Sequence, residues 1–301
     1  MTIRNVLIIS SVVLGLALLS VGGYFYFAVY KPFAKPNAPA SRDISDEINR
    51  ANETVPEDIS DGEENPDSGN LTNANIGKIG PLTFPDNFII SIFAEDLGKV
   101  RVLRFDPRGN LLASITSSGR IVAINDINND GKGELKTLLI DLNLPHGIAI
   151  KCDGDLVSKG PCDLYVAETN RIGLYSYDPE SINAVFVKRL FNLPADINQN
   201  HFTRTLEIAN YNGKPMLFTS VGSSCNVCNE KDPKRAAVLI SNLDGSGLRV
   251  FSNGLRNAVF FEQKPGSEEI WVTEMGRDLL GDNMPPEEIK ILQDGGFYGW
   301  P

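Results

Sequence analysis

The stretch that decides the fold reads Asn253-Gly-Leu-Arg-Asn-Ala-Val-Phe-Phe261 and then, after a polar turn, Glu269-Ile-Trp-Val-Thr-Glu-Met-Gly-Arg-Asp278. Both runs are short, apolar and bounded by turn-forming residues, which predicts two antiparallel strands. An acidic loop and the Gly/aromatic corner Gly295-Gly-Phe-Tyr-Gly-Trp-Pro301 follow. No helical period accompanies these apolar runs, so the stretch predicts an all-β unit.

The same strand pair recurs three times upstream, at a spacing of about 50 residues. Each repeat opens with a basic residue and has apolar residues two and four positions later; the first strands are predicted at 101–105, 146–150, 204–208 and 256–260. Second strands follow at 111–114, 164–168, 217–220 and 270–274, and third strands at 119–124, 172–177 and 236–241. A repeated meander of this kind is typical of β-propeller blades. We therefore predict about four blades over residues 81–301.

The basic residue that opens each first strand has a predictable position. The first strand of each propeller blade lines the central channel, so equivalent residues form a ring at one rim. The predicted ring contains Arg101, His146, Arg204 and Arg256. On a protein with a formal charge of −10, such a ring favours an anionic ligand, because Arg binds carboxylates in a bidentate manner. The alternative is that these side chains form salt bridges with neighbouring loops, including Glu168 and Glu274.

Residues 82–301 resemble the soluble, quinone-dependent glucose/sorbosone (aldose sugar) dehydrogenases. The resemblance is carried by His201-Phe-Thr-Arg-Thr-Leu-Glu-Ile208, Leu217-Phe-Thr-Ser-Val-Gly-Ser-Ser-Cys225, the pair Arg256-Asn257 and the turn Glu274-Met-Gly-Arg277. It implies a six-bladed β-propeller of the quinoprotein glucose dehydrogenase type. With about four blades in the sequence, we expect a propeller that is incomplete at its C-terminal end, as a fragment or half of a split protein. A complete four-bladed propeller is the alternative.

The resemblance also assigns the candidate catalytic residues, His201 and Arg256. His201 matches the general base that takes a hydroxyl proton while a hydride passes to pyrroloquinoline quinone (PQQ), and the pKa of an imidazole suits this task. Arg256 matches the Arg that stabilises negative charge on the quinone oxygens. The predicted cofactor-binding residues are Asn257, which matches a hydrogen-bonding Asn, and the ring members Arg204, His146 and Arg101. Without the resemblance, His201 is a loop residue that makes a local hydrogen bond.

Calcium is the second cofactor that the resemblance implies. In this family, main-chain carbonyls at the positions of Gly276 and Arg277 bind a calcium ion beneath the quinone, and hard oxygen ligands suit this ion. The sugar enzymes often have Pro where this chain has Arg277, which indicates a divergent branch. Glu287, Glu288 and Tyr298 lie where relatives place a second calcium ion.

A further calcium candidate is independent of the resemblance. The segment Asp126-Ile-Asn-Asn-Asp-Gly-Lys-Gly-Glu134 has oxygen-bearing side chains around a Gly, as at the start of a calcium loop. Its candidate ligands are Asp126, Asn128, Asp130 and Glu134. The twelfth position of the loop is Thr137, which excludes a full EF-hand. A hairpin turn that uses Asp/Asn/Gly chemistry explains the segment equally well.

The first 80 residues differ in composition from the repeats. Residues 6–30 carry no charge, are long enough to cross a bilayer as a helix, and end in a cluster of aromatic residues. This predicts a transmembrane anchor over residues 1–30, with a signal sequence as the alternative. Residues 31–80 are acidic and poor in large apolar residues, which predicts a disordered linker to the propeller domain at 81–301.

The four cysteines form two local pairs, Cys152 with Cys162 and Cys225 with Cys228. Such pairs suit disulfides in an oxidising compartment, whereas a zinc site at Cys225 and Cys228 lacks a second pair of ligands. We therefore expect the propeller to be extracytoplasmic, periplasmic or at the cell surface, although the positive-inside rule alone points the other way. The acidic net charge disfavours nucleic acid as a partner.

Three functions are compatible with these patterns. The first is a membrane-tethered quinoprotein dehydrogenase that oxidises a sugar or a related alcohol or aldehyde and passes electrons to an external acceptor. The second is a non-catalytic propeller module that binds a sugar or a protein, or an inactive fragment of the dehydrogenase. The third is a calcium lactonase, but the four strand starts lack the set of acids that such a channel site requires. His201 together with Arg256 and Asn257 favours the first function.

Overall fold

The computed structural model describes residues 78–79, 82–84, 88–152, 161–195, 200–281 and 284–301. The chain divides into two compact units, Met1–Thr72 and Asn73–Pro301, and all described residues belong to the second. The predicted transmembrane anchor at residues 1–30 and nearly all of the predicted linker at 31–80 lie outside the described residues. Within the described ranges, no helix has the length and apolar character needed to cross a bilayer.

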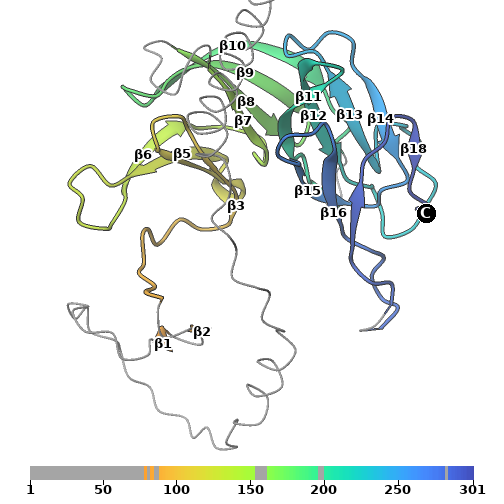
Figure 1. The fold of residues 1–301 in the computed structure, drawn as a ribbon, viewed down its shortest axis with the longest axis horizontal. Coiled ribbons are helices and arrows are strands. Elements are labelled where there is room, and N and C mark those ends of the chain that lie inside the picture. The colour runs from red at the N-terminus through yellow and green to blue at the C-terminus, as the bar shows by residue number, and fades with distance from the viewer. Residues whose placement is uncertain (1–77, 80–81, 85–87, 153–160, 196–199, 282–283) are drawn as a thin grey trace, which may run out of the picture. The chain divides into compact units, whose positions relative to one another are not determined.

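The described part of the second unit contains four larger sheets that follow one another along the chain (Figure 1). We refer to them as blades 1 to 4. Blade 1 contains β3 (Val100–Phe105), β4 (Leu111–Ile115), β5 (Arg120–Asn125) and β6 (Glu134–Leu139). Blade 2 contains β7 (Ile148–Lys151), β8 (Cys162–Glu168), β9 (Arg171–Asp178) and β10 (Asn183–Asn192). Blade 3 contains β11 (Leu206–Tyr211), β12 (Lys214–Val221), β13 (Ala237–Ser241), β14 (Arg249–Asn253) and β18 (Gly296–Phe297). Blade 4 contains β15 (Ala258–Gln263), β16 (Ile270–Glu274) and β17 (Glu288–Ile291).

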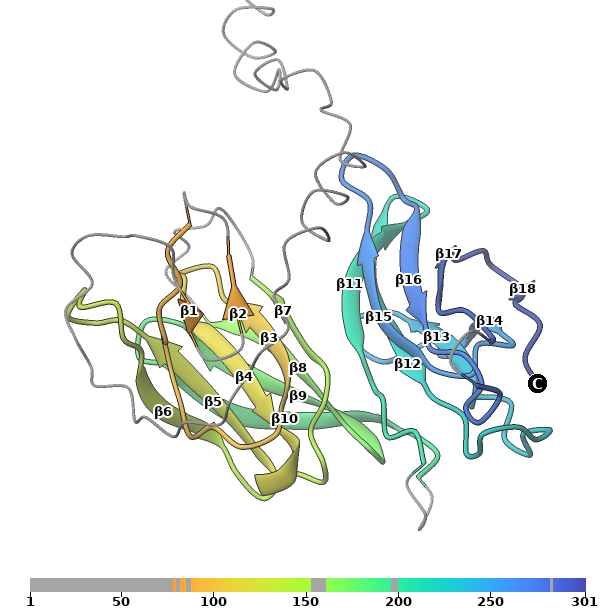
Figure 2. The ribbon, with the colours of Figure 1, turned by 90° about the horizontal axis from the view of Figure 1, so that it is seen from below.

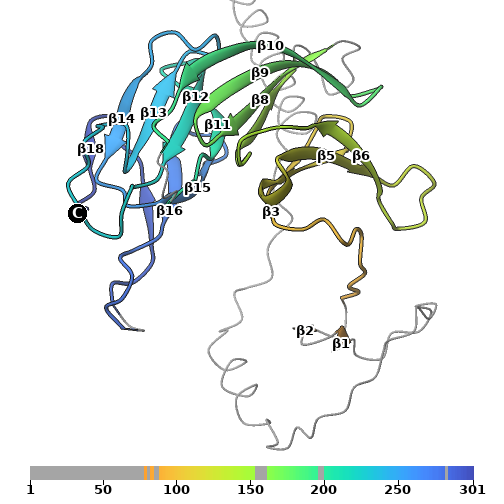
Figure 3. The same ribbon diagram turned by 180° about the vertical axis from the view of Figure 1, so that it is seen from behind.

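Each blade is an antiparallel meander in which consecutive strands pair. The one addition is β18, which pairs in parallel with β14 and returns the C-terminal Gly/aromatic corner to blade 3. A two-stranded sheet of β1 (Lys78–Ile79) and β2 (Leu82–Thr83) precedes the blades, and the 3-10 helix η3 (Thr116–Ser118) links β4 to β5. The first strands β3, β7, β11 and β15 contact one another in chain order, and the same succession of sheets is visible from below and from behind (Figures 2 and 3). The predicted all-β propeller with four blades is confirmed.

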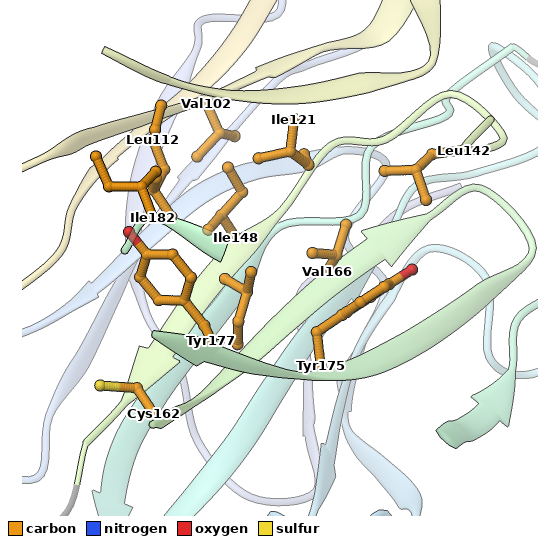
Figure 4. Close-up of a cluster of buried hydrophobic side chains, with 12 residues drawn as sticks. Val102, Leu112, Ile121, Leu142, Ile148, Cys162, Val166, Tyr175, Tyr177 and Ile182 are labelled. Carbon is orange, nitrogen blue, oxygen red and sulfur yellow. The ribbon is translucent and has the colours of Figure 1, made fainter. Parts of the chain in front are cut away.

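Apolar side chains fill the space between successive blades. Strand β8 shows how, because its residues are buried on both faces: Leu164 and Val166 pack toward blade 1, whereas Tyr165 and Ala167 pack toward blade 3. Figure 4 shows the cluster between blades 1 and 2, where side chains such as Val102 and Ile148 meet. A strand that is buried on both faces requires a near-continuous apolar sequence. The second strands therefore have the clearest apolar runs in the sequence.

Blade 4 packs on one face only. In β16, Ile270 and Val272 are buried against blade 3, while the alternate residues Trp271 and Thr273 are exposed. The exposed face of this blade also carries Phe260 and Ile289. The alternation of β16 therefore differs from the continuous burial of β8, although both are second strands of a blade.

The predicted strands lie within a few residues of the observed ones. The main difference is at the first strands of blades 2 to 4, because His146, Arg204 and Arg256 lie just before β7, β11 and β15 rather than within them. The outermost strands β6, β10 and β14 were not predicted; β6 and β10 are largely exposed, so they lack a clear apolar alternation. Both predicted disulfides are present, with Cα–Cα distances of 4.3 Å for Cys152–Cys162 and 6.2 Å for Cys225–Cys228.

Candidate functional site

His201 lies in the segment that enters β11, and its ring is held from the end of β12. Its Nδ1 lies 2.8 Å from Oγ and 3.0 Å from the main-chain oxygen of Ser223. Ser223 is fully buried and its N–H donates to the main-chain oxygen of Arg256 at 2.8 Å. The half-buried imidazole therefore has one nitrogen fixed by the protein, and no hydrogen bond of Nε2 is found among the described residues.

Asn257 lies beside His201, with Gly222 between them. A Cβ at Gly222 would lie 2.5 Å from His201 Cβ and 2.8 Å from Asn257 Oδ1, so only Gly allows the two side chains to approach the main chain this closely. The amide nitrogen of Asn257 contacts Met275 Sδ at 3.7 Å. Its Oδ1 is buried and has no hydrogen-bond partner among the described residues. An unpaired buried acceptor beside a held imidazole is the feature expected of a ligand-binding position.

Arg256 is buried, and its guanidinium group is engaged by two loops. Nε donates to the main-chain oxygen of Asn226 at 3.1 Å, and Nη2 donates to Asn226 Oδ1 at 3.0 Å. Nη1 donates to the main-chain oxygen of Gly276 at 2.5 Å, and Nη2 also forms an ion pair with Asp278. Arg256 therefore joins the loop of the Cys225–Cys228 disulfide to the turn that follows β16. We refer to His201, Gly222, Ser223, Arg256 and Asn257 as the His201 group.

The pKa of His201 lies below the usual value for an imidazole. Burial is the main cause, and the positive charge of Arg256 adds to it. The hydrogen bond to Ser223 and the carboxylates of Asp278 and Glu230 act in the opposite direction. The ring is therefore predominantly neutral at neutral pH, which is the state that a general base requires.

The chain's other histidine, His146, lies in an apolar environment on the neighbouring blade. Its ring is 6.2 Å from the ring of Phe202 and 6.4 Å from that of Phe260, measured between centroids. Arg101 lies 5.2 Å from the centroid of Phe202 in a cation–π contact. His146 is fully buried, and neither ring nitrogen has a partner among the described residues. Burial, followed by the charges of Arg101 and Arg204, lowers the pKa of His146 to about 3. We refer to Arg101, His146, Phe202 and Phe260 as the His146 group.

Arg204 donates to the main-chain oxygen of His201, and its positive charge also acts on His146. It is fully buried and donates to the main-chain oxygens of Thr169 at 3.0 Å, Pro194 at 2.7 Å, Thr203 at 2.6 Å and His201 at 3.2 Å. Its guanidinium group therefore holds together the loops that precede β11. An Arg with this many carbonyl acceptors has few N–H groups left for a ligand.

The predicted basic residues lie near one another, but their contacts differ from those expected of a ring around a ligand. A series of contacts and electrostatic interactions runs from Arg101 through His146 and Arg204 to His201 and Arg256. Carbonyl groups accept from the guanidinium groups of Arg204 and Arg256, and Asp278 pairs with Arg256; the expectation that all four residues face an anionic ligand stays a prediction. The alternative partners Glu168 and Glu274 have other contacts among the described residues. Glu168 pairs with Arg171, and Glu274 accepts the main-chain N–H of Asn257 at 3.3 Å.

Glu274 is a second unusual group beside Asn257. Its Oε2 is buried and has no hydrogen-bond partner among the described residues. Burial raises the pKa of this carboxyl to about 7, although the main-chain N–H groups of Asn257 and Arg256 oppose the shift. The carboxyl therefore changes charge near neutral pH, a property that clusters at functional sites.

The candidate metal ligands at the turn after β16 are dispersed. The carbonyl of Gly276 accepts the hydrogen bond from Arg256, and Arg277 is exposed. Glu287 accepts the N–H of Gly276 at 3.1 Å, whereas Glu288 pairs with Lys290 at 2.8 Å. Tyr298 O–H donates to Ile291 O at 2.6 Å, on the C-terminal segment. The carbonyl ligands proposed for calcium remain a prediction.

The segment 126–134 forms the exposed connection between β5 and β6. Asp126 accepts the N–H groups of Asp130 at 3.0 Å and Gly131 at 2.9 Å, and Glu134 accepts the N–H of Ile127 at 3.0 Å. Asn128 Nδ2 donates to Asp130 Oδ2 at 3.1 Å. These bonds are those of a hairpin turn built on Asp and Asn, and calcium binding by the segment stays untested.

In the described part of the chain, one group of three metal-ligand side chains converges within 4.8 Å: Cys225, Cys228 and Glu230. Both sulfur atoms belong to the disulfide, so they are not thiolates available to a metal. Glu230 instead accepts from Ser224 N–H at 2.5 Å and Ser224 Oγ at 2.8 Å.

Three residues of the site were not identified from the sequence: Ser223, Asn226 and Asp278. Each acts through a short-range contact to His201 or Arg256, and a lone Ser, Asn or Asp in a loop has no pattern of its own. The signal that could have located two of them is the Cys225–Cys228 pair, since a disulfide that closes so short a loop fixes the residues in and beside it.

The fold and the site define the class of the protein: an all-β propeller with four blades, of the quinoprotein glucose dehydrogenase fold. The calcium structure of the Trichoderma reesei family AA12 carbohydrate-active enzyme superposes with a TM-score of 0.54, covering 69% of this chain and 57% of the other at 24% identity. At that identity the likeness concerns the fold alone. The model of the TrAA12-like family matches residues 82–294, and the chain belongs to this family.

Two relatives extend the comparison. A protein of Borreliella burgdorferi described as uncharacterized is 29% identical over 224 residues, covering 73% of this chain and 56% of the relative. The pyrroloquinoline quinone-dependent sugar dehydrogenase of Hypocrea jecorina is 26% identical over 262 residues, covering 73% of this chain and 57% of the relative. The chain thus spans little more than half the length of these relatives.

Proposed function

We propose that this chain carries the base-containing side of a sugar-oxidising site in a PQQ-dependent dehydrogenase. The observation that carries the proposal is the pair formed across Gly222: an imidazole fixed at Nδ1, and a buried Asn257 Oδ1 with no partner among the described residues. Membership of the TrAA12-like family and the likeness to a quinone-dependent sugar dehydrogenase support it. The substrate class is a sugar or a related alcohol or aldehyde.

The residues present fit a quinone in part. Asn257 offers an unpaired amide oxygen, Gly222 keeps the main chain clear of side-chain bulk, and His201 offers a free ring nitrogen. These three residues would hold PQQ and substrate against each other. Arg256 would act at longer range, because its N–H groups are bonded to Asn226, Gly276 and Asp278. Calcium bound by the carbonyls of Gly276 and Arg277 is proposed with it, and these oxygens are of the type that calcium prefers.

The chemistry needs a base and a hydride acceptor. When bound, PQQ supplies the acceptor for the two electrons and the hydrogen that leave the sugar carbon as hydride. His201 Nε2 takes the proton of the hydroxyl on the same carbon, so that the C–OH group becomes a carbonyl. Arg256 would contribute positive charge from a distance toward the negative charge that develops in the reaction. An external electron acceptor must then remove the electrons.

The proposed cellular setting is extracytoplasmic and membrane-tethered. It is supported by the uncharged segment 6–30 and by two disulfides, which are typical of oxidising compartments. A six-bladed ring is part of the same proposal. The exposed face of blade 4 carries the apolar side chains of Phe260, Trp271 and Ile289, which a further blade would cover. Nucleic acid is not among the proposed partners.

A non-catalytic propeller module that binds a sugar or a protein is the second candidate. One observation favours it: the guanidinium groups of Arg204 and Arg256 are engaged by protein acceptors rather than open to an anionic quinone. The two candidates differ in whether the protein binds PQQ in the presence of calcium.

The test is equilibrium binding of PQQ to the full-length protein with calcium chloride, followed by oxidation of aldoses with a dye acceptor. We expect calcium-dependent binding that Asn257→Ala weakens. Asn210→Ala is the matched control, because Asn210 lies near the end of β11 that is remote from His201. This variant should bind PQQ as the unsubstituted protein does. A protein that shows no affinity for PQQ with calcium present is the binding module instead.

A further inference from the structure

The hydroxyl group of Ser223 lies at a branch point of the hydrogen bonds around His201. Its Oγ is 2.8 Å from His201 Nδ1 and donates its own proton to the main-chain oxygen of Cys225 at 2.7 Å. A hydroxyl has one proton, so Ser223 has only lone pairs to offer to Nδ1. The main-chain oxygen of Ser223, at 3.0 Å from the same nitrogen, is also an acceptor. Two acceptors therefore face Nδ1, and the ring proton belongs on that nitrogen.

We propose that Ser223 is a positioning residue that fixes the tautomer of His201, with the carbonyl of Cys225 setting the direction of its hydroxyl group. With the proton on Nδ1, Nε2 keeps its lone pair and is the nitrogen that can accept a proton. The catalytic consequence rests on the proposed function. The tautomer itself is a property of the folded chain and can be measured without a cofactor.

The Cys225–Cys228 disulfide gives this arrangement its rigidity. The loop that it closes supplies the Cys225 carbonyl to Ser223 and, through Asn226, two acceptors to Arg256. If the loop opened, the Ser223 hydroxyl could turn its proton toward His201 Nδ1. The main-chain oxygen of Ser223 would then be the acceptor that still favours a proton on Nδ1, and the imidazole proton would move in part to Nε2. The disulfide thus joins the orientation of His201 to the position of Arg256.

The chain provides matched controls for both parts of this proposal. Ser224 is the neighbouring hydroxyl in the same loop, but its Oγ donates to Glu230, and no hydrogen bond joins it to His201 among the described residues. The Cys152–Cys162 disulfide is the second disulfide of the chain; Cys162 is part of the core between blades 1 and 2, away from the Ser223 loop. Substitution at either place changes the same chemical group without changing the proposed contact.

The first experiment is ¹⁵N NMR of the imidazole nitrogens in the full-length protein labelled at histidine, without PQQ. The chain has two histidines, and the spectrum of a His146→Leu variant assigns the other ring. We expect His201 to carry its proton on Nδ1 near neutral pH. In Ser223→Ala, and in a Cys225→Ser/Cys228→Ser double variant, the proton should move partly to Nε2. Ser224→Ala and Cys152→Ser/Cys162→Ser should leave the His201 resonances in place.

The second experiment separates positioning from simple loss of structure by kinetics of the PQQ- and calcium-loaded protein. Ser223→Ala should lower kcat by about tenfold or more, the usual cost of losing an orienting partner, while KM stays near its original value. Ser223→Thr, which keeps the hydroxyl, should restore most of kcat.

Each result decides the proposal. A dominant Nε2–H tautomer in the unsubstituted protein would overturn it, whether or not any variant folds. An unchanged kcat in Ser223→Ala would overturn the catalytic part. A protein that shows the Nδ1–H tautomer but does not bind PQQ would confirm the positioning contact and refute the proposed dehydrogenase.

Discussion

The two histidines of this propeller occupy comparable places and have opposite environments. Each lies before the first strand of a blade, His146 before β7 and His201 before β11. His146 is fully buried between aromatic rings with both nitrogens unpaired among the described residues, and its pKa falls to about 3. His201 is half-buried, has Nδ1 fixed by Ser223 and adjoins Asn257. Both histidines therefore lie before the first strand of a blade, but His201 has polar neighbours and His146 has aromatic ones.

Of these two environments, that of His201 suits a general base. A general base needs a free lone pair, a fixed orientation and a path to the proton that it takes. His201 has a fixed ring, and its Nε2 has no hydrogen-bond partner among the described residues. His146 lacks an orienting hydrogen bond, and its buried ring is surrounded by Phe202, Phe260 and two positively charged residues that disfavour its protonation.

The largest effect is expected at His201. In the full-length protein loaded with PQQ and calcium, His201→Ala should lower kcat for aldose oxidation by about 10²–10⁴-fold, the usual contribution of a positioned base. PQQ binding should persist, because Asn257 and the calcium carbonyls are unchanged. The measurement is steady-state turnover with a dye acceptor, beside PQQ binding by equilibrium dialysis. Wild-type kcat in this variant would mean that the base is elsewhere, with His146 as the next candidate.

The next effect is on stability, at the Arg of each group. Arg256→Ala removes a buried cation that bonds Asn226, Gly276 and Asp278, and a buried acceptor left without its donor costs about 1–3 kcal/mol in the free energy of unfolding. Arg101→Ala, in the His146 group, removes an exposed side chain with one cation–π contact, worth about 0.5–1 kcal/mol. Urea denaturation of both variants measures the difference. Equal losses at the two positions would show that the engaged guanidinium group of Arg256 has no structural role.

The sequence predicted the blades well because burial on both faces leaves a strong signal. Runs such as Leu164 to Glu168 are apolar almost throughout, and the observed strand β8 contains them. The disulfide pairs were also predicted correctly, because each pair is local. The exposed strands β6 and β10 were missed, since solvent accepts almost any residue at their positions.

The sequence named candidate site residues, but it did not predict their contacts. Arg204 and Arg256 were expected to face a ligand, and the structure bonds them to main-chain carbonyls of Thr169, Pro194 and Gly276. Every residue has a carbonyl, so such acceptors leave no mark in the sequence. Only the folded loops determine which carbonyl meets which guanidinium group.

The pH dependence of stability should distinguish the two groups, beginning with His146. Its pKa is about 3 in the folded chain, against the ordinary value of 6.5 that applies in the unfolded chain. Between these two pH values the unfolded chain binds a proton at His146 and the folded chain does not. Stability is therefore lost as the pH falls below 6.5, by about 2 kcal/mol at pH 5. His146→Leu should remove this part of the acid sensitivity, as measured by urea midpoints at pH 5 and 7.5. An unchanged acid slope in His146→Leu would contradict the buried, unpaired state of the ring.

The last expected effect has the opposite sign and concerns Glu274, which lies beside the His201 group. Burial raises the pKa of Glu274 from 4.5 to about 7, so between these values the folded chain holds a proton that the unfolded chain releases. The stabilising contribution is complete below pH 4.5 and declines as the pH rises toward and beyond 7, by up to about 3 kcal/mol. Glu274→Gln cannot ionise and keeps an acceptor for the Asn257 N–H, so its stability should not decline over this range.

Paired urea denaturation at pH 5.5 and 8.5 tests this prediction, because the difference between the two proteins cancels the titration of all other groups. Glu180→Gln, at an exposed surface pair with Arg108, is the control and should follow the unsubstituted protein. A Glu274→Gln variant that still loses stability toward pH 8.5 as the parent does would place the titrating group elsewhere. The expected result would show that the blade edge beside Asn257 carries a carboxyl that is uncharged below neutral pH. The charge around His201 and Arg256 then changes in the same pH range in which a base at His201 has to work.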